Sequence, residues 1–156
     1  MSVALGVLAG CALLAPSLEK PRIELAGLRI DRMSLQDPDL TLILRMTNPN
    51  SISVPLESVN LQFELNDRPF AEGQTHAAVT LPARASALVE LSLHAHGDVL
   101  VRSFKEMLFS PGGNLRYRIK GQAVVSSLGL HFDIDSIGTT DFDTLLGRHH
   151  ASGSTQ

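Results

Sequence analysis

The chain has 156 residues, of which 44% are hydrophobic and 19% charged. These values fit one folded domain with a short flanking segment and exclude a disordered chain. The formal net charge of −3 offers no basic surface for nucleic acid. Aromatic residues make up only 4% and Trp is absent, so any core must consist mainly of Leu, Val, Ile and Ala. No apolar run reaches the roughly 18 residues that a membrane-spanning helix needs.

The N-terminal residues 1–15 carry no charge and contain the single cysteine of the chain, Cys11. The segment 8–11, Leu-Ala-Gly-Cys, resembles a bacterial lipobox, in which small residues expose the bond before a cysteine whose thiol is lipidated. A signal peptide opens with a basic segment, and residues 1–8 have none, so either the true start lies upstream or the match is accidental. The alternative interpretation is a buried structural cysteine.

We favour the lipobox because no second cysteine is present to form a disulfide or a metal site. This predicts a signal-peptide-like segment at 1–10, a lipidated Cys11 with a linker at 11–21, a folded domain at 22–143 and a polar tail at 144–156. The mature chain would be tethered rather than membrane-spanning. An alanine after the cysteine suits the periplasmic side of an outer membrane in a bacterial cell envelope. If the match is accidental, we expect a cytoplasmic protein.

Alternation of apolar and polar residues, the period of a strand with one buried face, recurs along the domain. It predicts strands at 22–35, 40–47, 59–65, 70–72, 76–81, 86–96, 115–125 and 130–135. Gly27 interrupts the first alternation and predicts a β-bulge. We expect the 76–81 and 86–96 strands to pair with each other across a turn at 82–85, and the 59–65 strand to turn back at 66–69.

A corner of Asn48, Pro49 and Asn50 ends the second strand, because proline donates no ladder hydrogen bond and restricts the residue before it. Asn side chains bond nearby backbone and tolerate left-handed turns, so we interpret the corner as structural. Gly73 ends the return strand of the next hairpin. The strand before it carries a polar row that we interpret as its solvated face: Asn60, Gln62, Glu64 and Asn66.

The segment 97–109 breaks the period of two, because its apolar residues recur near helical spacing and Asp98 can cap the first turn. Residues 110–113, Ser-Pro-Gly-Gly, end this pattern. We predict one short amphipathic helix that crosses between sheets or covers one end of the fold. Its apolar stripe is interpreted as core packing.

The register of the last two strands follows from the position of the loop between them. If 126–129 form the hairpin loop, Gly121 faces Ile134, so a small residue lies opposite a large one on the inner face. On the outer face Lys120 then faces Asp135, a cross-strand pair worth ~0.2–1 kcal/mol. A shift of one residue would turn the whole inner set outward. Together the elements predict an all-β, immunoglobulin/fibronectin-III-like β-sandwich of about seven to eight strands with one short helix.

Two sets of side chains are candidates for binding a cation. His94 and His96 share one strand face, with His76 and His131 on other strands, but the sequence fixes no third ligand. The second set lacks a glycine-centred calcium loop and is better explained by pairing with Arg116, Arg118 and Lys120: Asp133, Asp135, Asp141 and Asp143. No nucleophile elbow or phosphate loop is present. We therefore predict no catalytic residue, no metal and no cofactor.

The order of these motifs carries a family resemblance. The Asn48–Pro49–Asn50 corner follows an alternating strand and precedes the segments 59–66 and 70–73, with further matches at 81–93 and 114–121. In this order the chain resembles the type 2 late embryogenesis abundant family, also called the water-stress and hypersensitive-response (WHy) domain, over roughly 21–141. The resemblance implies an immunoglobulin-like or fibronectin-like sandwich, an association with desiccation or related stress, and no catalytic residues. Bacterial members with a signal peptide are similar to envelope lipoproteins.

Two functional hypotheses follow. The first is a non-catalytic, stress-associated envelope protein, held to a membrane through Cys11, whose polar faces contact envelope proteins or a lipid surface. The alternative is a binding module in membrane maintenance that carries an apolar ligand or binds a protein partner. A cavity lined by Leu, Val and Phe would favour the alternative, whereas a packed core would count against an apolar ligand. A hydrolase is the most distant option and would need a cleft converging on His or Asp.

Overall fold

A computed structural model describes residues 18–32, 34, 38–75, 77–95, 97–109 and 113–146. Within these residues the chain forms nine strands: β1 (Arg22–Arg32), β2 (Asp39–Thr47), β3 (Val54–Leu56), β4 (Ser58–Leu65), β5 (Arg68–Gln74), β6 (Val79–Leu81), β7 (Ser86–His94), β8 (Leu115–Val125) and β9 (Leu130–Thr140). The helices are α1 (Gly97–Leu108), α2 (Phe142–Leu145) and the 3₁₀ turn η1 (Ser126–Leu128).

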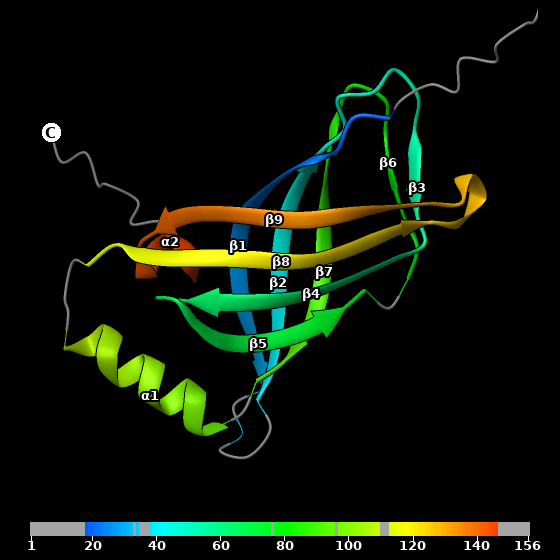
Figure 1. The fold of residues 1–156 in the computed structure, drawn as a ribbon. Helices are drawn as coiled ribbons and strands as arrows, with labels where there is room; N and C mark the ends of the chain where they lie inside the picture. The colour runs from blue at the N-terminus through cyan, green and yellow to red at the C-terminus, as the bar shows by residue number, and fades with distance from the viewer. Residues whose placement is uncertain are drawn as a thin grey trace, which may run out of the picture.

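Seven strands form one antiparallel sheet in the order β1-β2-β7-β5-β4-β8-β9, and β3 pairs with β6 in a separate ribbon. The large sheet curls, so that β1, β2 and β7 form one layer and β5, β4, β8 and β9 cross it in a second (Figure 1). The edge strands approach each other where Ser136 Oγ donates to the Ile23 carbonyl oxygen at 2.9 Å. The predicted all-β fold is confirmed, and the two layers are halves of one continuous curled sheet.

The core fills the space between the two layers. Leu42 and Leu91 from one layer and Phe63 and Ile119 from the other are fully buried, and burial of each such side chain stabilises the fold by ~1.5–3 kcal/mol. The Phe63 and Phe70 rings meet edge to face with centroids 5.9 Å apart, a favoured geometry for aromatic pairs. This packing among the described residues counts against the hypothesis of an apolar ligand carried between the layers.

Local sequence signals explain the first hairpins. The predicted bulge at Gly27 is confirmed, because the β1–β2 register shifts between Leu25 and Gly27. The β4–β5 turn is shorter than predicted, since β5 already begins at Arg68. Only Asn66 and Asp67 form the loop, with φ angles of 50° and 62°. Positive φ at both positions is the requirement of a two-residue type I′ hairpin, which Asn and Asp tolerate.

The predicted pairing of the next two strands is wrong. β6 pairs with β3, and β7 lies between β2 and β5. β3 has only three residues and contains Pro55, so it gives no readable alternation in the sequence. Strand partners this far apart in the chain are chosen by packing of the whole sheet, which a local pattern does not encode.

The predicted register of the last hairpin is confirmed, with Gly121 opposite Ile134 and Lys120 opposite Asp135. The predicted ion pair between Lys120 and Asp135 does not form. Lys120 Nζ instead lies 3.0 Å from Glu64 Oε1, and Arg118 binds Asp135 through two hydrogen bonds of 3.0 and 2.8 Å. β4 runs along the other side of β8, so Lys120 has a second carboxylate within reach that the hairpin alone does not reveal.

The predicted helix is confirmed as α1, which connects β7 to β8 and lies beside the sheet, below β5 in Figure 1. Arg68 Nη1 and Glu106 Oε1, 2.9 Å apart, join it to the start of β5. A second helix, α2, is too short to read from the sequence. Asp141 caps it by accepting from the Thr144 backbone N at 2.8 Å and the Thr144 hydroxyl at 2.7 Å. Leu145 of α2 is part of the core.

Candidate functional site

The Asn48 side chain is a buried hydrogen-bonding node at the end of β2. Its Nδ2 donates toward the carbonyl oxygens of Ile52, Leu81 and Pro82 at 2.9, 3.2 and 3.0 Å. Its Oδ1 accepts from the backbone N and the Nδ2 of Asn50 at 3.0 and 2.9 Å. Asn48 is 0% exposed, so the protein itself uses its hydrogen-bonding capacity, and the corner ties β2 to the β6–β7 turn.

Asn50 connects the same corner to the chain that precedes β1. Its Oδ1 accepts from the Glu19 backbone N at 2.8 Å, and its Nδ2 donates to the Glu19 carbonyl oxygen at 2.9 Å. The Asn50 side-chain amide and the Glu19 backbone thus exchange two hydrogen bonds, as the backbones of two paired strand residues do. The described residues that precede β1 therefore join the domain at the Asn corner.

Gly73 and Gly121 lie at positions where neighbouring strands approach closely. A Cβ on Gly73 would overlap the Ser92 carbonyl oxygen of β7, and a Cβ on Gly121 would overlap the Asn60 carbonyl oxygen of β4. Both glycines flank Leu61 in register and face inward with it. They allow the sheet to curl sharply at β5 and β8.

Two rows of polar residues cross five strands on the outer side of this curl, one on each side of the glycine row. The first polar row is Asp133, Gln122, Asn60, Gln74 and Ser92. The second polar row is Asp135, Lys120, Gln62, Glu72 and His94. Because strands lie ~4.8 Å apart, each row extends over about 19 Å. Local alternation shows that these residues face outward but not that they line up across five strands.

A hollow of about 610 Å³ lies between the two polar rows. Its lining holds four side-chain amides, which offer both donors and acceptors: Asn60, Gln62, Gln74 and Gln122. Gln122 donates to Asp133 at 3.1 Å. Within the described chain, six other lining side chains make no hydrogen bond or ion pair with the protein: Asn60, Gln62, Gln74, Glu72, Ser92 and His94. These side chains are therefore solvated, and no described protein group competes for their hydrogen bonds.

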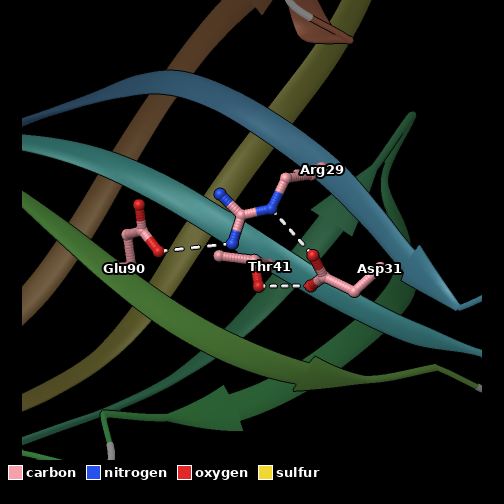
Figure 2. Close-up of polar contacts among 4 residues, drawn as sticks. All are labelled: Arg29, Asp31, Thr41 and Glu90. Atoms are coloured by element: carbon pink, nitrogen blue, oxygen red, sulfur yellow. Dashed lines mark hydrogen bonds and ion pairs between the residues drawn. The ribbon is translucent and has the colours of Figure 1, made fainter.

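A polar cluster continues the first row over β7, β2 and β1 (Figure 2). Arg29 Nε donates to Asp31 Oδ1 at 2.7 Å, Arg29 Nη2 donates to Glu90 Oε2 at 3.3 Å, and the Thr41 hydroxyl donates to Asp31. The hydrogen bonds from Arg29 and then Thr41 lower the pKa of Asp31 below its usual value of 3.8. Since every member is bonded to another, this cluster holds the strands together rather than offering a site.

The two candidate cation-binding sets, from which we predicted no metal site, do not assemble within the described residues. His94 and His131 lie on β7 and β9, with β5, β4 and β8 between them, while His76 and His96 lie outside the described chain. The acidic set disperses: Asp133 binds Gln122, Asp135 binds Arg118, and Asp141 caps α2. No group of three His, Cys, Asp or Glu side chains in the described ranges is placed to hold a metal ion.

Cys11 and the residues around it lie outside the described chain, so the lipobox prediction remains a prediction. Among the helices that the structure describes, none has the length and hydropathy to cross a membrane.

The fold and its motifs define a class of protein: a small all-β sandwich whose second strand ends at a buried Asn corner. Residues 44–136, more than half of the chain, match the family model described as "Late embryogenesis abundant protein". The chain belongs to this late embryogenesis abundant family, as its motifs predicted. Among the curated proteins compared with it, none matches.

One solved structure supports the fold, and two others are less similar to it. The solution structure of AT1g01470 from Arabidopsis thaliana is 16% identical, with a TM-score of 0.59 over 81% of this chain and 84% of that chain. A crystal structure of a protein from Archaeoglobus fulgidus is 16% identical, with a TM-score of 0.41 over 81% and 99%. A putative late embryogenesis abundant protein, At2g46140.1, is 14% identical, with a TM-score of 0.34 over 78% and 72%. Only the first has a TM-score above 0.5, and at 16% identity it supports the fold alone.

Proposed function

We propose that this protein is a non-catalytic, membrane-tethered domain that protects the bacterial cell envelope during water loss. The family match over residues 44–136 carries the proposal. Proteins of this family are generally non-enzymatic. The described surface agrees with such a role, since its polar groups are spread in rows rather than converging on one reactive atom.

The Asn corner limits how far the domain could lie from a lipid at Cys11. Asn50 holds Glu19 at the corner, and the eight residues from Cys11 to Glu19 span at most ~28 Å when extended. A lipid at Cys11 would therefore keep the corner end of the domain near the membrane. The polar rows would remain accessible to envelope components, whether proteins or a lipid surface.

Membrane fractionation tests the tether. We expect the wild-type protein in the membrane fraction and the Cys11→Ala variant in the soluble fraction, because the thiol is the lipid attachment point. Ala12→Asp is the matched control, since it keeps the cysteine and should move the protein from the outer to the inner membrane. Unchanged membrane association of Cys11→Ala would contradict the tether.

Gene deletion tests the protective role. We expect the deletion strain to lose survival after drying and to recover it when the wild-type gene is restored. Detergent challenge of the same strains separates this role from envelope maintenance. Detergent sensitivity with normal survival after drying would overturn the stress proposal and support the maintenance alternative, and no phenotype in either challenge would overturn both.

A further inference from the structure

The hollow between the two polar rows has features of a ligand site rather than of an ordinary wet sheet face. Its volume of about 610 Å³ is open to solvent rather than enclosed, so a ligand would rest on the sheet face with one side in water. The residues of each row are in register across β9, β8, β4, β5 and β7. Leu61, Gly73 and Gly121, which face inward, form its floor with their backbone. A ligand could therefore lie across the strands.

The chemistry of the lining selects against charged and apolar ligands. The lysine of the lining, Lys120, already forms an ion pair with Glu64 at 3.0 Å. Little positive charge therefore remains to attract an anion. Glu72 and Asp133 add negative charge to the lining, which would further repel phosphate or nucleic acid. Leu61 is 4% exposed, so no apolar side chain is available as an anchor for a lipid.

A peptide is also a poor fit for this face. Extended peptides bind sheets mainly by adding a strand to a free edge, but β4, β5 and β8 are each paired on both sides. Recognition in the hollow must therefore come from side chains. Their amides, hydroxyl and imidazole offer both donors and acceptors along ~19 Å, and a ligand rich in hydroxyl groups can bond to both kinds.

We propose that the hollow binds a neutral linear glycan lying across β9, β8, β4, β5 and β7. The central contacts would come from Asn60 and Gln62 on β4, with Gln74 and Gln122 on either side and Ser92 at one end. Because the lining contains no Phe, Tyr or Trp ring to stack on a sugar, the affinity depends mainly on the number of hydrogen bonds and therefore on ligand length. This inference goes beyond the proposed function and does not depend on lipidation of Cys11.

Nuclear magnetic resonance titration of the full 156-residue chain tests the site. The probes are cellohexaose, maltohexaose and the hexamer of N-acetylglucosamine. Each is compared with the disaccharide (dimer) of the same sugar and linkage. We expect at least one hexamer to bind tenfold or more tightly than its dimer and to shift the side-chain amide signals of Asn60, Gln62, Gln74 and Gln122. The inference is overturned if no hexamer does so, if the shifts fall outside the hollow, or if an oligogalacturonate binds more tightly than every neutral hexamer.

A matched pair of variants localises the binding. Gln62→Ala removes an amide that no other side chain of the protein uses, and we expect roughly threefold to tenfold weaker hexamer binding. Asn114→Ala removes an exposed amide outside the hollow and should leave binding unchanged. Equal effects of the two variants would overturn the placement. A failure of glycan binding together with a drying defect in the deletion strain would remove this inference alone and leave the protective role standing.

Discussion

The Asn corner and the polar rows use the same kinds of side chain in opposite ways. Asn48 is 0% exposed, and both ends of its amide are bonded to protein groups. Asn60 and Gln62 are exposed and bond to no described side chain. A buried amide whose partners are all protein groups contributes to the fold. An exposed amide without partners contributes little to stability and is available to a ligand or surface.

The largest effect should come from the glycine row between the polar rows. In Gly121→Ala the new Cβ overlaps the Asn60 carbonyl oxygen, and backbone of β4 has to move. We expect the free energy of unfolding to fall by about 3 kcal/mol or more, measured by urea denaturation. Gly27→Ala is the control, because its Cβ would meet the Leu145 carbonyl oxygen at an ordinary 3.7 Å. Equal losses in the two variants would contradict the close approach at Gly121.

The next effect tests the comparison itself. Asn48→Ala leaves three carbonyl groups and the Asn50 backbone N without this partner, so we expect a loss of ~2–3 kcal/mol. Asn60→Ala removes the same group from an exposed position and should change the free energy of unfolding by no more than ~0.5 kcal/mol. If both variants lose the same stability, the distinction between a structural and an available amide is wrong.

A smaller effect is expected at Asn50, which lies between these extremes. Asn50→Ala removes two hydrogen bonds to the Glu19 backbone and one to Asn48, and we expect a loss of ~1 kcal/mol. Amide hydrogen exchange provides the specific readout, because the Glu19 amide should exchange faster in the variant while amides in the middle of β2 remain protected. Unchanged exchange at Glu19 would show that Asn50 does not hold the N-terminal segment.

The smallest effect is a pH dependence from the cluster of Figure 2. Hydrogen bonds from Arg29 and Thr41 lower the pKa of Asp31 in the folded protein below 3.8. The resulting stabilisation is present above that value and is lost as the pH falls through the folded-state pKa. Urea midpoints measured from about pH 5 to pH 2 should fall less steeply in Asp31→Asn and in Arg29→Ala than in the wild type. An unchanged slope in both variants would contradict the bonding of Asp31.

The sequence predicted those parts of the fold that depend on neighbouring residues. Alternation located the long strands, Gly27 located the bulge, and the assignment of 126–129 as the hairpin loop gave the β8–β9 register. It did not predict the partners of β3, β6 and β7, because these pairs form between distant segments. The Lys120 ion pair was wrong for the same reason, since Glu64 comes from a strand outside the hairpin.

The candidate site was predicted only in part. Asn60 and Gln62 were recognised as a polar row along one strand, but the alignment of polar residues across five strands requires the strand order. No local pattern carries that order. The Asn corner was recognised as structural from the residue types alone, and the structure adds its partners, which come from the β6–β7 turn and from Glu19.

The central claim is that the exposed polar rows carry the function while the buried corner carries the fold. The most direct measurement is the survival after drying of a deletion strain that expresses the triple variant Asn60→Ala, Gln62→Ala and Gln74→Ala. The account predicts that the triple variant is produced at the wild-type level with nearly wild-type stability, and that it fails to restore survival. Survival equal to that with the wild-type gene would contradict the claim.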